Sequence, residues 1–286
     1  MYKSIVYPLL SSNKKIYKYS DRRFKRSTGV SKRVFHIMVD TVAKEFKLTK
    51  VNGGRKRKHS IPILILIFLE YYRHYIIMDY LASVYSCHES TICRIISTIE
   101  KILINSDLFK VKGKGHLIEL NDEILVTDVT ESEIERPTKN QKAYYSGKKK
   151  KHSFKTQIII NKNTFEILSV DICKGKVHDF QLFKDSQVHF NESITIICDS
   201  GYQGIKELHK NSIIPQKKSK GKELTKEQKS SNRLISSQRI IIEHVNRFIK
   251  IFRIISTKYR NKGKKFGLRM NLISGIYNLE RVRTQY

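Results

Sequence analysis

The sequence of 286 residues is poor in acidic side chains: 26 Asp and Glu stand against 56 Lys and Arg, which gives a formal net charge of +30. Charge of one sign repels itself in a folded chain, and solubility does not require so much of it. A drift toward lysine contributes to the excess but does not explain the scarcity of acidic residues. The imbalance therefore points to a polyanionic partner, such as nucleic acid.

Long apolar runs and paired cysteines are also missing. The run 61–69 is too short to cross a bilayer and is closed by Glu70 and Arg73. The first 12 residues contain Pro8 and lack the apolar core of a signal peptide. The four cysteines form no Cys-x-x-Cys pair and lie in apolar or helical contexts, as small core residues in a reducing compartment do. We expect a cytoplasmic protein without a membrane span.

Residues 1–112 have helical spacing of their apolar side chains and are predicted to form an all-α domain. One helix is expected over 34–46, and another begins after Ser60, with Pro62 in its first turn. The most specific pattern lies near 75–103. There, an apolar helical face over 76–84 is followed by Ser86 to Glu89, which matches a capping box and predicts a second helix from Cys87.

This second helix should be amphipathic. Its expected apolar face is Ile92, Ile95, Ile96, Ile99 and Ile102. Its expected outward residues are Glu89, Ser90, Thr91, Arg94 and Thr98. Two helices joined by a tight turn, with small polar and basic residues outward, are typical of a helix-turn-helix, and Arg94 is then a candidate DNA contact. An ordinary helical hairpin is the alternative.

Beyond a Gly-Lys connector at 110–114 the periodicity becomes strand-like, so we place a second domain at 113–286. Its first strand is expected over 124–127, ending at Asp128, with residues 129–137 leaving the sheet. The later elements are strands at 154–161 and 166–173, a helix over 179–190, and a strand that leads to Asp199. This β-β-β-α-β order predicts an α/β domain with a mixed, ribonuclease-H-like sheet.

Three carboxylates in this second domain could meet. Asp128 and Asp199 each follow an apolar strand, although a lone Asp in such a place is usually a turn former. Glu243 lies near the apolar stripe of a later long helix, where Arg239 or Arg247 is the simplest partner.

Three carboxylates at one sheet edge would repel each other unless a cation neutralised them. Oxygen ligands favour Mg²⁺, and a pair of such ions can promote in-line displacement at phosphorus.

A basic loop with interleaved aromatic residues spans 144–152, and Lys148, Lys149 and Lys150 are its candidate phosphate contacts. Several segments then appear in a recognisable order. They are Asp128 to Glu131 with Arg136-Pro137, Tyr145 to Lys149 with His152, Gly175 to Asp179, Asp199 to Gly204, and Arg239-x-x-x-Glu243 followed by Lys250. In these segments the chain resembles DDE-type insertion-sequence transposases, similar to members of insertion-sequence family five with an N-terminal helix-turn-helix.

The resemblance implies that Asp128, Asp199 and Glu243 are catalytic metal ligands, with Mg²⁺ as cofactor and Mn²⁺ as a substitute. It implies DNA contacts by Arg239 and Lys250. His178 and Asp179 would lie near the site, although Asp179 could simply cap its helix. Ser236 replaces a Tyr found in many relatives, so a Tyr contact to DNA is not expected.

The implied function is binding of terminal inverted repeats, followed by cleavage and transfer of DNA strands. The implied partners are double-stranded DNA, at the element ends and the target, and a second copy of the chain in a homodimer or larger assembly. A domesticated or inactive DNA-binding regulator is one alternative. A related metal-dependent nuclease that does not join strands is the other.

Overall fold

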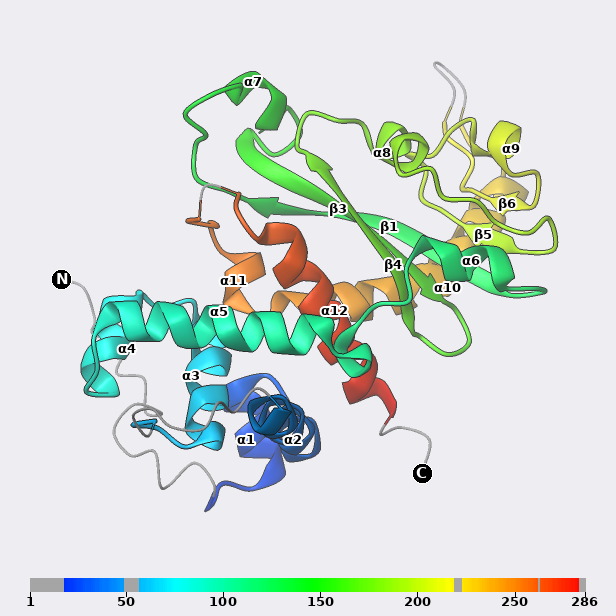
Figure 1. Cartoon of the computed structure of the whole chain (residues 1–286). Helices are drawn as coiled ribbons and strands as arrows, with labels where there is room; N and C mark the ends of the chain where they lie inside the picture. The colour runs from blue at the N-terminus through cyan, green and yellow to red at the C-terminus, as the bar shows by residue number, and fades with distance from the viewer. Residues whose placement is uncertain (1–17, 49–56, 219–222, 262, 283–286) are drawn as a thin grey trace. The chain divides into compact units, whose positions relative to one another are not determined.

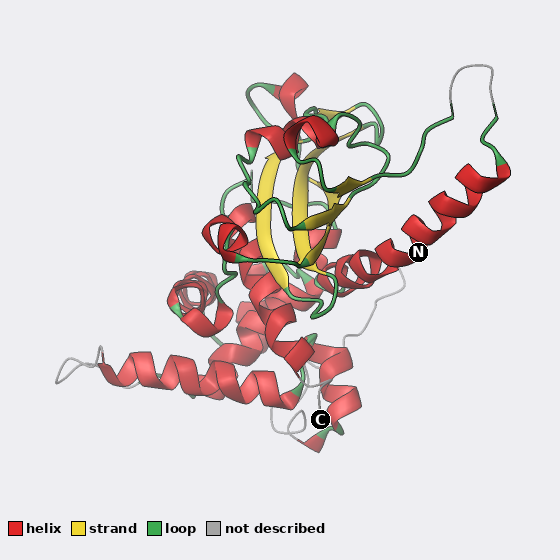
Figure 2. Ribbon diagram, turned by 90° about the vertical axis from the view of Figure 1, so that its right-hand side faces the viewer, coloured by secondary structure: helices red, strands yellow, loops and turns green. Residues whose placement is uncertain are grey.

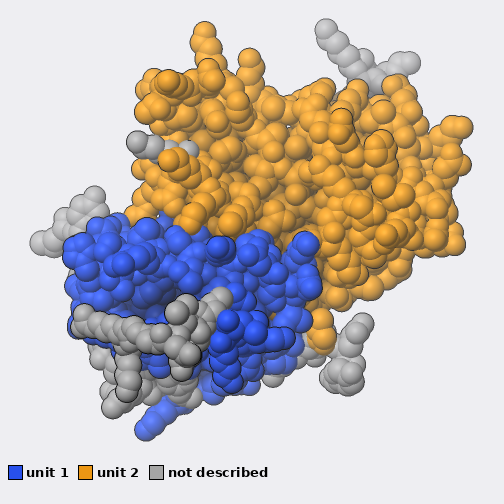
Figure 3. Space-filling view, viewed as in Figure 1, with its two compact units in different colours: residues 1–110, 251–254, 285–286 blue, residues 111–250, 255–284 orange. Residues whose placement is uncertain are grey.

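The computed structural model describes residues 18–48, 57–218, 223–261 and 263–282, which fall into two compact units (Figures 1 and 3). Unit 1 comprises 1–110, 251–254 and 285–286, and unit 2 comprises 111–250 and 255–284. Within the described ranges, no helix is both long and apolar enough to cross a membrane. The cysteines are free thiols; Cys198 is buried as expected, but Cys93 is exposed.

Unit 1 is built from helices. They are α1 (Asp21–Thr28), α2 (Lys32–Leu48), α3 (Ile61–His74), α4 (Met78–Val84), α5 (Glu89–Asn105) and the 3-10 helix η2 (Asp107–Phe109). Helix α3 starts after Ser60 with Pro62 in its first turn, as predicted, because proline's fixed φ suits that position and its missing N–H is not needed there. Helix α3 is buried along most of its length and forms the centre of this unit.

The turn between α4 and α5 corrects one prediction. Helix α5 begins at Glu89, not at Cys87, and its N-cap is His88, whose Nδ1 accepts a hydrogen bond from the Ser90 N–H at 3.2 Å. Ser86 has a φ of 49°, in the left-handed region. An N-cap residue needs extended backbone, which His88 has and Ser86 does not, so the capping box does not form.

The amphipathic character of α5 agrees with the sequence pattern. Ile92, Ile96 and Ile99 are fully buried, whereas Arg94 and Thr98 are exposed. The helix therefore presents its small polar and basic residues to solvent.

Unit 2 contains a mixed sheet of six strands. They are β1 (Ile124–Glu133), β2 (Tyr145–Ser146), β3 (Lys151–Asn161), β4 (Ile167–Lys174), β5 (Thr195–Ile197) and β6 (Ser212–Ile213). Strand β1 pairs antiparallel with β3 and parallel with β5; β4 pairs antiparallel with β3, and β6 pairs parallel with β5. The short β2 pairs with the start of β3.

Helices flank this sheet (Figure 2). They are α6 (Lys114–Glu119), α7 (Gln141–Tyr144), α8 (Asp179–Asp185), α9 (Ile205–Leu208), α10 (Lys226–Lys250), α11 (Arg253–Ser256, which spans the division between the units) and α12 (Phe266–Arg281).

Strand β1 is longer than predicted. It continues past Asp128 to Glu133, so residues 129–133 do not leave the sheet. The polar sequence there resembles a loop, but β3 supplies a partner along its whole length, down to the pair Glu133↔Ser153. Pairing with a long neighbour has overridden the local composition.

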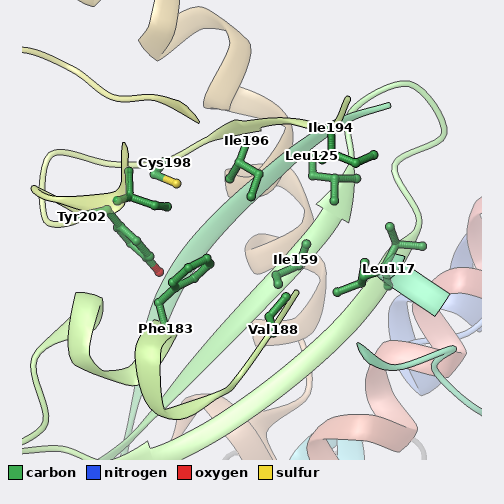
Figure 4. Packing of buried hydrophobic residues seen from close by; sticks show 11 residues of the cluster. Leu117, Leu125, Ile159, Phe183, Val188, Ile194, Ile196, Cys198 and Tyr202 are labelled. Atoms are coloured by element: carbon green, nitrogen blue, oxygen red, sulfur yellow. The ribbon is translucent and has the colours of Figure 1, made fainter. Parts of the chain in front are cut away.

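The two faces of the sheet have different surroundings. Leu125, Ile159, Ile196 and Cys198 belong to one buried apolar cluster and lie on the same side of the strands (Figure 4). Side chains alternate along a strand, so Asp128, three positions after Leu125 in β1, points to the opposite face. On that face α10 packs against β1 and β5.

Candidate active site

The register of two parallel strands brings Asp128 and Asp199 to the same level. Strands β1 and β5 are adjacent, with Val126 paired to Ile197, and each aspartate comes two residues later in its own segment. Cys198 faces the apolar cluster, so Asp199 turns to the other side, where Asp128 also points. The two carboxylates thus share one face at the carboxyl ends of neighbouring parallel strands, the usual position of ligand sites in α/β sheets.

Helix α10 holds the Asp128 carboxylate with two side chains. Arg239 Nη2 lies 3.2 Å from Oδ1, and Asn246 Nδ2 donates to Oδ2 at 3.1 Å. Residues seven positions apart lie on the same face of a helix, two turns from each other. Both oxygens of Asp128 are therefore engaged from one stripe of α10.

The Asp128 carboxylate lies in an unfavourable environment for negative charge. Burial raises its pKa above the ordinary value; Arg239 opposes this effect, and Asp199 and Asp179 add to it. The side chains of Asp128 and Arg239 are only 22% and 21% exposed. An additional cation beside Asp128 and Asp199 would lower the cost of both charges.

Asp199 is held by its own backbone turn. Its Oδ1 accepts a hydrogen bond from the Gly201 N–H at 2.7 Å. A Cβ at position 201 would come within 2.8 Å of the same oxygen, so a side chain there would displace the Asp199 carboxylate. The turn-forming role considered from the sequence is therefore real, and it leaves Oδ2 without a described hydrogen bond.

Glu243 does not join the two aspartates. It lies on α10 between Arg239 and Asn246, but its side chain is exposed and makes no hydrogen bond or ion pair with another described residue. Arg239, one of its two expected partners, contacts Asp128 instead. Across the described ranges, no three His, Cys, Asp or Glu side chains are arranged to hold a metal ion.

The auxiliary pair is placed beside the same sheet. Asp179 is the first residue of α8, and the N-cap position belongs to His178, so Asp179 does not cap this helix. Lys155 of β3 donates to Asp179 Oδ1 at 2.8 Å and to the Val177 carbonyl at 2.7 Å. Lys155 had no sequence signal beyond its place in a strand, and it was missed.

The predicted DNA contacts are accessible, with one exception. Arg94 is exposed on α5 of unit 1, where its Nε donates to the Ser90 carbonyl at 3.2 Å. In unit 2, Lys148, Lys149 and Lys150 are exposed in the turn between β2 and β3, and Lys250 is the exposed last residue of α10. Arg239 is the exception, because it is mostly buried against Asp128.

The order of the two domains agrees with comparisons to protein families. Residues 127–277 match the family of DDE superfamily endonucleases, and residues 64–106 match the helix-turn-helix of DDE superfamily endonucleases. The chain therefore belongs to the DDE superfamily endonucleases, as a DDE-type insertion-sequence transposase with an N-terminal helix-turn-helix.

One relative gives a more particular comparison. The chain is 46% identical over 261 residues to the probable transposase for insertion sequence element IS702 of Microchaete diplosiphon, covering 91% of this chain and 94% of that protein. No solved structure matches the chain.

Proposed function

We propose that the protein binds the terminal inverted repeats of a mobile element through the helix-turn-helix and catalyses divalent-metal-dependent cleavage and transfer of DNA strands. The observation that carries the proposal is the pair Asp128 and Asp199, level on adjacent parallel strands and facing the helix that bears Glu243. The 46% identity to a probable transposase supports it over almost the whole chain.

The residues around Asp128 suit a hard divalent ion. The available donors are carboxylate oxygens, together with Asn246 Oδ1, which is buried and has no hydrogen-bond partner among the described residues. Oxygen-only donors favour Mg²⁺, for which Mn²⁺ can substitute. Asp128, Asp199 and Glu243 would hold the metal, which when bound supplies an activated nucleophile and stabilises the leaving oxygen.

The protein's own side chains would prepare this site. Arg239 and Asn246 fix both oxygens of Asp128, and the Gly201 N–H fixes one oxygen of Asp199. Glu243 would complete the set from the neighbouring turn of α10. For Glu243 to act as a ligand, its exposed side chain must turn toward Asp128.

We also propose that the sheet is ribonuclease-H-like. Its supporting feature is the strand order β4-β3-β1-β5-β6, in which three long antiparallel strands are followed by two short parallel ones. Helix α8 lies between β4 and β5 in the chain, as the β-β-β-α-β order requires.

The proposed DNA interface uses both units. Arg94 on α5 would enter a groove of the repeat, and Lys148, Lys149 and Lys150 would contact backbone phosphates. Lys250, and Arg239 when released from Asp128, would approach the reacting phosphate. Because an element has two ends, we propose that a homodimer or larger assembly acts on them together.

Nicking of supercoiled plasmid by the purified full-length chain tests this function. Mg²⁺ or Mn²⁺ should support nicking, a chelator should stop it, and Asp199→Asn and Glu243→Gln should each abolish it without weakening DNA binding. Repeat-end duplexes then test joining: integration of labelled ends supports transposition, whereas cleavage without joining indicates a nuclease. Tight repeat binding with no metal-dependent cleavage of either substrate would indicate a regulator and refute the catalytic proposal.

A further inference from the structure

A basic hollow lies on unit 2, and neither Asp128 nor Asp199 lines it. Its volume is about 600 Å³. It is lined by Thr138, Asn140, Gln141, Lys142, Ala143, Lys174 and Lys176. None of these residues is acidic, and the three lysines are exposed. The hollow thus combines three positive charges with several neutral hydrogen-bonding side chains.

The walls of the hollow are fixed by backbone contacts. The Lys176 N–H donates to the Ala143 carbonyl at 3.1 Å, and the Gly175 N–H donates to the Ser153 carbonyl at 2.9 Å. A Cβ on Gly175 would meet Ser153 Oγ at 2.3 Å and the Tyr144 carbonyl oxygen at 2.7 Å, so the segment 174–176 packs closely against α7 and β3. The backbone that lines the hollow is therefore held in place by hydrogen bonds and close packing.

The charges of these lysines are not neutralised by the protein. Lys142, Lys174 and Lys176 form no ion pair with any residue in the described ranges. Other lysines of unit 2 are paired. The pairs are Lys112–Glu166 at 3.3 Å, Lys114–Asp171 at 2.6 Å, Lys151–Glu133 at 2.6 Å and Lys155–Asp179 at 2.8 Å. The chain has only 26 acidic residues, and those in the ion pairs above do not line the hollow. The hollow therefore remains positively charged.

A short, anchored segment connects the hollow to the aspartates. Lys176 is three residues from Asp179, so their Cα atoms are at most about 11 Å apart. Lys155 holds this segment through the Val177 carbonyl and the Asp179 carboxylate. Asp179 is near enough to Asp128 to influence its pKa. A DNA strand bound in the hollow would therefore reach the carboxylates within a few nucleotides.

The positive surface also continues past the hollow. Helix α7 leads directly into β2 and then into the turn that carries Lys148 to Lys150 (Figure 1). Tyr145, between them, is 41% exposed. A small anion would be held by converging, buried donors, whereas exposed cations spread along two consecutive segments suit an extended polyanion.

We propose that the hollow lined by Lys142, Lys174 and Lys176 binds backbone phosphates of the DNA next to the phosphodiester being cut. The inference rests on the proposed function, because it takes DNA as the substrate. It adds a phosphate-binding site that positions the strand relative to Asp128 and Asp199 without taking part in the chemistry. Neutral side chains such as Gln141 would donate further hydrogen bonds; its Oε1 already accepts from Arg136 Nε at 2.8 Å, which leaves the amide N–H groups free to donate.

The test is the salt dependence of DNA binding by the full-length chain. The variant K142Q/K174Q/K176Q is compared with K210Q/K217Q/K226Q, which removes the same net charge from exposed lysines of unit 2 outside the hollow. Affinity for a labelled duplex is measured by fluorescence anisotropy in chelator, between about 50 and 200 mM salt. The variant K142R/K174R/K176R keeps the charge and serves as the conservative replacement.

Each phosphate contact contributes about 0.9 to the slope of log affinity against log salt. The hollow variant should lower that slope by about 2 to 3, whereas the control and the arginine variant should stay close to the wild type. Equal slopes for the hollow variant and the control would overturn the proposal.

Metal-dependent nicking by the wild type is measured in parallel and separates the two proposals. Nicking with equal slopes refutes only the phosphate site. A reduced slope for the hollow variant, with no wild-type cleavage of either plasmid or repeat-end duplex, supports phosphate binding in the hollow and refutes the catalytic function.

Discussion

Glu70 in unit 1 and Asp128 in unit 2 both lie in surroundings that disfavour a negative charge. Only Asp128 lies at a candidate active site. Glu70 on α3 is 2% exposed, and burial raises its pKa to about 8. Burial also raises the pKa of Asp128. Asp128, however, has Arg239 and Asn246 on its oxygens and a second aspartate at the same strand level. A perturbed carboxylate becomes a candidate site through its neighbours, and burial alone does not make it one.

The largest difference between the two residues should appear in DNA cleavage. Asp128→Asn should lower metal-dependent plasmid nicking by about 10³-fold or more, as expected for a group that acts directly in a reaction. Glu70→Gln, an equally conservative change in a buried carboxylate, should retain most of the nicking. Comparable losses in both variants would mean that Asp128 is needed for folding rather than for catalysis.

The pH dependence of stability, in contrast to DNA cleavage, should depend strongly on Glu70. Between pH 4.5 and about 8 the unfolded chain loses the Glu70 proton while the folded chain keeps it, so the free energy of unfolding should fall as the pH rises through this window. The loss could reach about 5 kcal/mol. Glu70→Gln should flatten this dependence and be more stable than the wild type at pH 8. Urea unfolding followed by circular dichroism at pH 5 and pH 8 measures it; unchanged pH dependence in the variant would contradict the prediction.

The neighbours of Asp128 can be tested singly. Asn246→Ala removes the hydrogen bond to Oδ2 and should raise the Mg²⁺ concentration for half-maximal nicking by about 10- to 100-fold. His244→Ala, at an exposed position on the same helix, is the matched control and should not shift it. An unchanged Mg²⁺ requirement in Asn246→Ala would show that its amide does not position Asp128.

A smaller effect is expected on the Asp199 side. Gly201→Ala places a Cβ against Asp199 Oδ1 and should displace the carboxylate, lowering nicking by roughly tenfold while DNA affinity stays the same. Gly115→Ala, where an added Cβ meets no atom within 4 Å, should leave nicking unchanged. Equal activities in these two variants would indicate that the Asp199 turn tolerates a side chain.

Sequence patterns predicted the order of the main elements but not all of their ends. The polar residues 129–133 resembled a loop, because the partners that keep them in β1 lie 20 to 28 residues further along the chain, from Glu133↔Ser153 to Val129↔Gln157. The start of α5 was misplaced because a capping box specifies side chains, whereas the left-handed φ of Ser86 depends on the turn that follows α4. Such errors concern pairing and local backbone, which composition does not encode.

The site was predicted in part for a similar reason. The spacing of Arg239 and Glu243, four residues apart, predicted that they lie one turn from each other on a helix, and α10 spans both residues. Which of them points toward Asp128 depends on the rotation of α10 against the sheet. Packing of Ile242 and Val245 sets that rotation, so Arg239 and Asn246 reach the aspartate and Glu243 does not.

The pairing of β1 with β5 also determines which mutations this protein can tolerate. Only three residue pairs align the two strands, and Cys198 and Asp199 face opposite sides. Loss or gain of a single codon between 194 and 198 would therefore turn the carboxylate into the apolar interior and a neighbouring residue outward. Such a frame-preserving change would leave every acidic residue in the sequence and still abolish the arrangement at Asp128. Inactive copies of such a gene need not lack any of the acidic residues.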